Sequence, residues 1–440
     1  MKNTKIFSWS ITVALAGFLF GFDTVVISGA DLELQKLWPR GDWFHGFVVM
    51  SSALWGTVIG AMFGGIPTEK LGRKKTLIGI GILYSISAIG AAVVSDPFSF
   101  AFFRFIGGLG VGASTIAAPA YISEIAPAEN RGKLVGTYQF NIVFGILIAF
   151  WSNYLLSGIE QEAWRYMIGI EAIPAIIYTL MVLRIPESPR WLITAKNDTV
   201  GATKVLEKIY PKEEIPEIIE LMKTNTEEAQ NNESIFMGKY RFPLSLAFLI
   251  AFFNQFSGIN AFLYYAPRIF EGAGLGAQTA LLSSIGIGVV NLLFTLIGMS
   301  LIDKFGRRQL MYLGSVGYIL SLGLVGYAFS TGMTGMAVPV FLFLFIASHA
   351  VGQGAVIWVF ISEIFPNHLR SNGQAFGCSV HWVLAAIIPA LVPVLFTQVG
   401  EGPVFYFFAF MMVLQLLFVY KMMPETKGVV LENMQNTLAK

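Results

Sequence analysis

The sequence contains little charge and a single cysteine. Charged residues make up 13% of the 440 residues, against about 25% in ordinary soluble proteins. The formal net charge is only +2, and we expect no nucleic acid partner. Cys378 has no second cysteine to pair with, which excludes an internal disulfide framework. No spacing typical of a nucleophile with its base or of metal ligands is present, so the sequence indicates no enzyme, no metal site and no cofactor.

Long apolar stretches dominate the chain instead. Hydrophobic residues make up 55% and aromatic residues 14%, most of them Phe. A helix needs about 20 apolar residues to cross a bilayer, so each long stretch is a candidate span. We therefore predict an all-α integral membrane protein, in contact with membrane lipid, with twelve transmembrane helices at 6–29, 45–66, 76–95, 97–121, 133–157, 164–184, 241–266, 278–302, 309–330, 337–362, 371–397 and 402–423.

The distribution of basic residues predicts the orientation. Cytoplasmic loops of membrane proteins carry an excess of Lys and Arg. Here nearly all of these residues lie at the two ends of the chain and in the loops after even-numbered helices, whereas the opposite face holds Lys36, Arg40, Arg165 and Arg268. Both termini and the polar stretch 185–240 are therefore predicted to be cytoplasmic. Short amphipathic helices are expected in that stretch, at 204–210 and 217–222.

The two halves of the chain share repeated sequence motifs. Glu69-Lys-Leu-Gly-Arg-Lys recurs 234 residues later as Asp303-Lys-Phe-Gly-Arg-Arg, and Ile122-Ser-Glu-Ile-Ala-Pro recurs 239 residues later as Ile361-Ser-Glu-Ile-Phe-Pro. Such repeats in transporters place the substrate site near the membrane midplane, between the halves. They predict an amino-terminal six-helix bundle, a cytoplasmic helical linker, a carboxy-terminal six-helix bundle and a cytoplasmic tail, at 1–184, 185–240, 241–423 and 424–440.

One charged pair is predicted inside the membrane. Asp23 lies in the first apolar span, six residues before Gly29, and Arg104 lies in the fourth span, eight residues after Asp96. At 1.5 Å per residue, both side chains lie roughly 10 Å below the same face. A carboxylate near the centre of a membrane helix costs about 2.5–3.5 kcal/mol on insertion scales. We therefore expect Asp23 and Arg104 to form an ion pair.

Three motifs resemble the sugar porter family of the major facilitator superfamily. They are Pro186-Glu-Ser-Pro-Arg-Trp-Leu, Pro424-Glu-Thr-Lys-Gly and Gln255-Phe-Ser-Gly-Ile-Asn. The resemblance covers essentially the whole chain. It implies the major facilitator fold, transport by alternating access and a monosaccharide, hexose or pentose, as substrate. It also implies a protein that works as a monomer, and with the short loops it suggests the inner membrane of a bacterium.

The resemblance assigns a sugar site to amides and aromatic rings, the groups that recognise hydroxyls and the weakly apolar face of a sugar. The implied residues are Phe22, Gln139, Asn254, Gln255, Asn260, Asn291, Trp358, His381 and Trp382. Tyr264 and Tyr265 match tyrosines that close the outer mouth. His381 is a departure, because glucose and xylose carriers of the family usually have Asn or Gln there. It tilts the prediction slightly towards a ketose, although a structural hydrogen-bonding role stays open.

The resemblance also assigns a charge network that bridges helix ends on the cytoplasmic face when that side is closed. Its residues are Arg73, Glu124, Arg131, Glu187, Arg307, Glu363, Arg370 and Glu425. The basic members of this set also contribute to topology.

The aspartate at position 23 favours proton symport, because proton-coupled members tend to have aspartate there and facilitative members asparagine. Asp23 and Arg104 would then be the coupling pair. Facilitative uniport stays open, as does a purely structural ion pair. A sugar sensor that does not transport is a further alternative, but such members carry a long cytoplasmic tail, which we do not expect here.

Overall fold

A computed structural model describes residues 2–127, 129–159, 162–228, 234–366 and 369–428, and the regular structure in these ranges is helical. Eleven helical stretches are long and apolar enough to cross a membrane, and a twelfth is formed by Asp42–Met50 and Ser52–Phe63, which meet at a bend of 42°. The prediction of twelve transmembrane helices is confirmed.

The first six spans are α1 (Lys2–Val26), η2 (His45–Met50) with α4 (Ser52–Phe63), α6 (Arg73–Val93), α7 (Pro97–Ile125), α8 (Arg131–Leu156), and α9 (Ala163–Gly169) with α10 (Ala172–Val182). The second six are α14 (Arg241–Phe256) with α15 (Ile259–Gly272), α16 (Ala277–Phe305), α17 (Arg307–Thr331), α18 (Ala337–Val351) with α19 (Gln353–Glu363), α20 (Arg370–Val399) and α21 (Glu401–Lys421).

Three further spans are broken, and each break lies beside residues of interest. Gly258 separates α14 from α15 and adopts the left-handed conformation, with φ +82°. Gly352 separates α18 from α19. Glu171 lies between α9 and α10. Backbone groups freed at such breaks are tolerated at membrane depth only where protein or water satisfies them.

Glycines let helices within the first half pack closely. A Cβ at Gly21 would lie 1.9 Å from the carbonyl oxygen of Ile142, and a Cβ at Gly145 would lie 2.1 Å from that of Phe18. These clashes show that α1 and α8 meet backbone against backbone. Membrane helices associate through small residues in this way, because lipid gives them no hydrophobic driving force.

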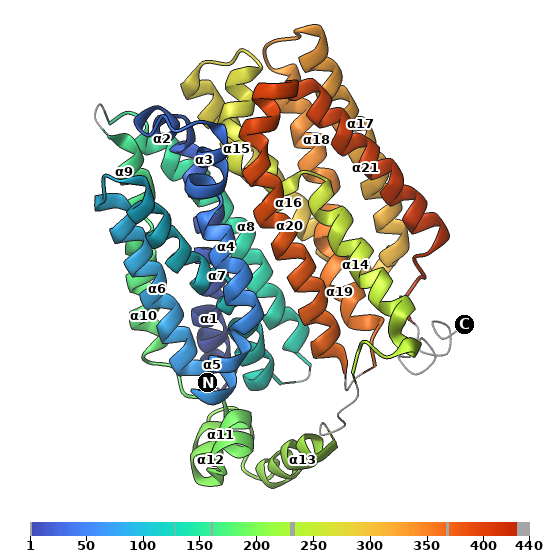
Figure 1. Ribbon diagram of the computed structural model, residues 1–440. Helices are drawn as coiled ribbons and strands as arrows, with labels where there is room; N and C mark the ends of the chain where they lie inside the picture. The colour runs from blue at the N-terminus through green and yellow to red at the C-terminus, as the bar shows by residue number, and fades with distance from the viewer. Residues whose placement is uncertain (1, 128, 160–161, 229–233, 367–368, 429–440) are drawn as a thin grey trace. The chain divides into compact units, whose positions relative to one another are not determined.

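The remaining helices are short. They are η1 (Ile27–Gly29), α2 (Asp31–Leu37), α3 (Asp42–Phe44), α5 (Gly65–Lys70), α11 (Pro189–Lys196), α12 (Thr199–Leu206), α13 (Ile215–Glu228) and η3 (Gly238–Tyr240). Figure 1 shows α11, α12 and α13 beyond the ends of α1 and α5. The helix predicted at 217–222 lies within α13.

The helix predicted at 204–210 is displaced towards the amino end. Asp198 caps α12 by accepting a hydrogen bond from the Gly201 amide at 2.7 Å, so the helix begins at Thr199 and ends at Leu206. The capping side chain fixes the start of this helix, as Asp does at many helix N-termini.

The described chain divides into two compact units. One comprises residues 1–23, 53–146 and 168–232, and the other comprises 24–52, 147–167 and 233–440. In the second unit, the ends of several first-half helices therefore pack with the second half of the sequence. A Cβ at Gly46 in η2 would lie 2.0 Å from the carbonyl oxygen of Ala390 in α20.

Candidate functional site: a buried ion pair and an amide cluster

The predicted ion pair between Asp23 and Arg104 is present. Nη1 of Arg104 on α7 donates to Oδ1 of Asp23 on α1, and Nη2 donates to the Asp23 carbonyl oxygen at 3.1 Å. The side chain of Arg104 is 0% exposed and that of Asp23 is 2% exposed. Removing one partner of so deeply buried a pair leaves an uncompensated charge, which costs about 3–5 kcal/mol.

A second carboxyl group, that of Glu171, lies beside this pair. It sits at the break between α9 and α10, is 1% exposed, and interacts electrostatically with Asp23 and Arg104. Its Oε1 has no hydrogen-bond partner within the described residues. One guanidinium, paired with Asp23, thus interacts with two buried carboxyl groups.

Sequence reasoning missed Glu171. The sequence did contain an indication of it, because placing an acidic residue inside an apolar span costs free energy and therefore suggests a functional role. The surroundings add to the polarity of this region. The Tyr84 hydroxyl interacts with both Asp23 and Glu171, and a Cβ at Gly107 would lie 2.4 Å from the Ser87 hydroxyl and 3.7 Å from Asp23 Oδ1. The core of the first bundle is therefore ionic and polar.

In the second half, amides gather around the break at Gly258. Nε2 of Gln255 donates to Oδ1 of Asn254 at 2.9 Å and lies 3.2 Å from Nδ1 of His381 on α20. Nδ2 of Asn260 donates to Oε1 of Gln255 at 2.9 Å. The structure thus joins four of the predicted sugar-site residues into one hydrogen-bonded group.

Two tryptophans flank the histidine of this group. The ring centroids of Trp358 and His381 lie 5.1 Å apart, and those of His381 and Trp382 lie 5.0 Å apart. Trp358 comes from α19, past the break at Gly352, so four helices, α14, α15, α19 and α20, contribute to the arrangement. Together with the amides, these rings form a surface with donors, acceptors and aromatic faces, as a sugar requires.

The remaining predicted sugar-site residues lie elsewhere in their bundles. Asn291 on α16 is buried, and its Oδ1 accepts a hydrogen bond from the Thr295 hydroxyl at 3.4 Å. Phe22 on α1 is buried next to Phe18, with ring centroids 5.9 Å apart. Gln139 on α8 is half-buried.

Both predicted gate tyrosines are buried. Tyr264 and Tyr265 lie in α15, and the Tyr265 hydroxyl donates to the carbonyl oxygen of Pro389 on α20 at 3.1 Å. The backbone of Tyr265 departs from helical geometry, with φ −121° and ψ 18°. Two residues later Pro267 lies inside the helix, and proline removes a backbone donor and kinks a helix.

The charge network on the predicted cytoplasmic face is built twice. In the first half, Nη2 and Nε of Arg73 donate to the two carboxylate oxygens of Glu124 at 2.9 and 3.1 Å. The Ser188 hydroxyl donates to Glu124 at 2.5 Å. Glu187 accepts from the backbone amide of Lys74 at 3.0 Å. These contacts tie the start of α6 and the end of α7 to the Pro-Glu-Ser motif.

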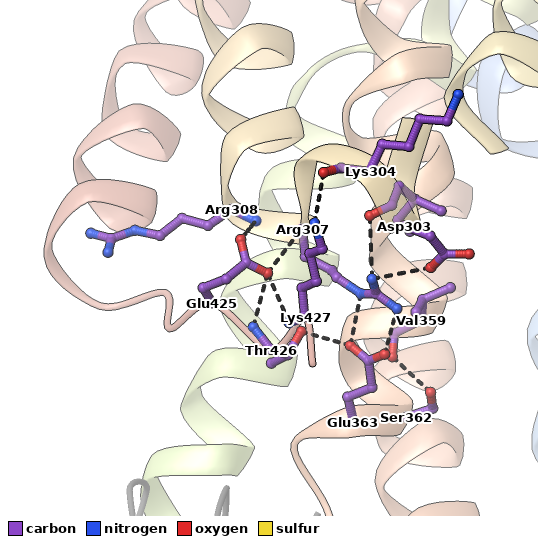
Figure 2. Close-up of polar contacts among 11 residues, drawn as sticks. Asp303, Lys304, Arg307, Arg308, Val359, Ser362, Glu363, Glu425, Thr426 and Lys427 are labelled. Atoms are coloured by element: carbon purple, nitrogen blue, oxygen red, sulfur yellow. Dashed lines mark hydrogen bonds and ion pairs between the residues drawn. The ribbon is translucent and has the colours of Figure 1, made fainter. Parts of the chain in front are cut away.

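The second half repeats this arrangement contact by contact. Arg307 donates to Glu363 at 2.6 and 3.0 Å, the Thr426 hydroxyl donates to Glu363 at 2.6 Å, and Glu425 accepts from the Arg308 amide at 3.0 Å. Figure 2 shows Glu363 and Asp303 directed at the Arg307 guanidinium, with Glu425 at the backbone amides of Arg307 and Arg308. Each network closes within its own half.

Arg131 and Arg370, the other two arginines predicted for this network, open α8 and α20. Within the part of the chain that the structure describes, the carboxylates of Glu124 and Glu363 pair with Arg73 and Arg307. An arginine at the start of α6 or α17 meets the end of the following helix side by side and can donate two parallel hydrogen bonds.

Comparisons with known proteins agree with this arrangement. The family model described as "Sugar (and other) transporter" matches residues 9–438. The D-xylose-proton symporter of Escherichia coli (strain K12) is 32% identical over 99% of this chain and 96% of its own length. The glucose transporter GlcP of Staphylococcus epidermidis is 36% identical over 100% of this chain and 98% of its own.

A solved structure agrees as well. The partially occluded inward open conformation of the xylose transporter XylE from E. coli matches with a TM-score of 0.87 and 31% identity, over 97% of this chain and 100% of that one.

Proposed function

The chain belongs to the sugar transporter family of the major facilitator superfamily, and from this premise we propose that it is a monosaccharide–proton symporter that works by alternating access. It is an integral membrane transporter and not an enzyme. The observation that carries the proton part of the proposal is the buried group of Asp23, Arg104 and Glu171. The named symporter relative adds support, since its name includes both xylose and protons.

The proposed coupling follows from the charges of this group. A nearby guanidinium favours the ionised form of a carboxyl group, whereas burial favours the neutral form. When a proton neutralises Asp23, Arg104 loses its partner and α1 can shift against α7. A proton that binds better in one facing state than in the other shifts the equilibrium between them. In this proposal Glu171, which interacts electrostatically with Arg104, becomes the partner of the guanidinium while Asp23 is neutral.

The proposed sugar site is the group formed by Gln255, Asn254, Asn260 and His381 with the neighbouring tryptophans, completed by Gln139, Asn291 and Phe22. Amides can donate to one sugar hydroxyl and accept from another. The moving parts are the two predicted six-helix bundles, 1–184 and 241–423. We propose that both termini and α11 to α13 face the cytoplasm, that the membrane is the inner membrane of a bacterium, and that the protein works as a monomer.

Facilitative uniport is the second candidate. The pairing of Asp23 with Arg104 favours uniport. A purely structural role of the two residues would require the same pairing.

Uptake by proteoliposomes separates these functions. Labelled glucose, xylose, arabinose and fructose are supplied with and without an inward proton gradient. We expect uptake of at least one sugar, and accumulation above the outside concentration only when the gradient is imposed. Equal final levels with and without the gradient would contradict symport and favour uniport. No uptake of any of the four sugars would contradict the substrate class.

A further inference from the structure

A buried charge cluster, separate from the coupling pair, lies at the loops predicted to face outside. The carboxylate of Asp31 in α2 accepts hydrogen bonds from Nε of Arg268 at 2.6 Å and from Nη2 of Arg268 at 2.9 Å. It also lies 2.6 Å from Nε2 of His45 at the start of η2. Asp31 and His45 are each 1% exposed, and the side chain of Arg268 is 16% exposed. Gln35 adds its amide oxygen as a further acceptor for Arg268.

The cluster joins the two halves of the sequence. Asp31 and His45 belong to the first half, whereas Arg268 lies in α15 of the second half, and all three lie in one compact unit. Arg268 also lies over the ring of Tyr265, with its guanidinium carbon 5.5 Å from the ring centroid. The guanidinium therefore connects Asp31 to the kinked segment of α15 that carries the gate tyrosines.

From these contacts we propose that Asp31, His45 and Arg268 form an outer latch, which holds the outer ends of the first-half helices against α15 and must open before a sugar can enter from outside. The inference rests on the proposed alternating access. It concerns the equilibrium between facing states, and it does not depend on which sugar is carried or on proton coupling.

Charge suits a latch of this kind for a physical reason. In the closed state the fork of Arg268 satisfies both carboxylate oxygens of Asp31, so burial leaves no lone charge. In an open state water reaches the same groups and solvates them, so separation leaves no unsatisfied polar atom. An apolar seal would instead expose hydrophobic surface on opening. The cytoplasmic networks differ in kind, because each joins residues of the same half.

The latch can be tested with spin labels. Leu37 at the end of α2 is 45% exposed and Met336 before α18 is 55% exposed. Each is changed to Cys in a Cys378→Ser background, and the distance distribution is measured by electron paramagnetic resonance without sugar or proton gradient. We expect Arg268→Gln to raise the ratio of the longer-distance population to the shorter one by about fivefold or more, as for typical allosteric couplings. Asp31→Asn should do the same.

Controls distinguish a latch from general damage. Arg165→Gln removes a charge from a local pair with Glu162 at the same predicted face, at 3.0 Å, and should leave the distribution unchanged. The double variant Asp31→Asn/Arg268→Gln should shift it no further than either single variant, because both changes break one interaction. Arg268→Lys should shift it less than Arg268→Gln.

Unchanged distances in folded Arg268→Gln and Asp31→Asn proteins, or an equal shift in Arg165→Gln, would overturn the latch. A failure of gradient-driven uptake with normal distance shifts would instead contradict the proposed symport and leave the latch standing.

Discussion

The two halves of this chain carry the same network at their predicted cytoplasmic ends but different chemistry in their membrane cores. Arg73 with Glu124 and Arg307 with Glu363 occupy corresponding motif positions and make corresponding contacts. The cores diverge around one repeated residue. Tyr84 of the first half interacts with Asp23 and Glu171, whereas Tyr318, 234 residues later, bonds to Nδ1 of His349 at 2.5 Å.

This difference separates two tasks. The core of the first half is ionic, with Asp23, Arg104 and Glu171, and is suited to binding and releasing a proton. The described core of the second half holds neutral groups, such as the amides of Gln353 and Gln415, which bond to each other. The repeated motifs thus keep the same contacts at the loops of both halves, while the cores differ in a way that supports the proposed coupling role of the first.

The largest expected effect comes from Asp23→Asn, which removes the carboxylate from the ionic core. We expect loss of sugar accumulation driven by a pH gradient, with sugar binding retained, because the variant mimics a permanently protonated side chain. Thermal stability should fall, since Arg104 loses its anionic partner. Asp96→Asn is the matched control, because Asp96 is an exposed cap of α7. Full gradient-driven accumulation by Asp23→Asn would leave Asp23 as a structural residue.

The next largest effect is expected in the neutral core, from Gln255→Ala. A lost hydrogen bond together with an unsatisfied partner costs about 1–3 kcal/mol, so sugar affinity should fall roughly five- to more than a hundredfold. Gln139→Ala should also weaken binding. As a control, Gln415→Ala removes another buried amide of this half, one that donates to the Ser315 hydroxyl at 2.8 Å, and should lower stability without lowering affinity. Unchanged affinity in both Gln255→Ala and Gln139→Ala would remove these amides from the site.

Glu171→Gln tests whether the ionic core uses both carboxyl groups. We expect sugar exchange to persist while gradient-driven uptake falls about tenfold, a 1.4 kcal/mol effect, and its pH profile shifts. The reason is that the variant removes the second carboxyl group that interacts with Arg104. The measurement is the initial rate of uptake in proteoliposomes across a range of outside pH. An unaltered rate and profile would assign Glu171 to structure alone.

How much of the fold and of the candidate site the sequence predicts depends on whether a feature is encoded by residues that are close together in the chain. The twelve spans follow from local apolar length, and the Asp23–Arg104 pair followed from depth along straight helices. The contact between Asp31 and Arg268 joins residues 237 positions apart, and no local pattern or repeat indicates it. It arises only when the ends of the helices are packed in three dimensions.

Helix breaks limited the prediction in a similar way. Glu171 lies at the break between α9 and α10, and an apolar run of residues does not indicate where a helix breaks. The sequence predicted the members of the cytoplasmic charge network but not their pairing, for a related reason. Motif spacing shows which residues share a face of the membrane, but the crossing of neighbouring helices decides which of several arginines meets a given carboxylate.

The repeated network predicts similar behaviour in the two halves. Glu124→Gln and Glu363→Gln each remove one acceptor of a bidentate arginine pair, and each should lower the free energy of unfolding by about 1–3 kcal/mol. Partial exposure of these groups keeps the effect below that of Asp23→Asn. Thermal unfolding of the two purified variants checks this expectation. A large loss of stability in one variant and none in the other would show that the two networks do not contribute equally to stability.

The smallest effect is expected from His381→Asn, which keeps a hydrogen-bonding group beside Gln255 but shortens it and removes a ring from between Trp358 and Trp382. Preference among sugars should change by a few fold, since hydrogen bonds to individual hydroxyls are gained and lost, while expression and stability stay near those of the parent. Competition by glucose, xylose and fructose for a labelled sugar measures the change. His349→Asn is the matched control, because that buried histidine bonds to Tyr318 in the same core and should affect stability and not preference. Identical competition profiles before and after His381→Asn would make His381 a structural partner of Gln255, and the recognition of different sugars would then depend on the amides and tryptophans alone.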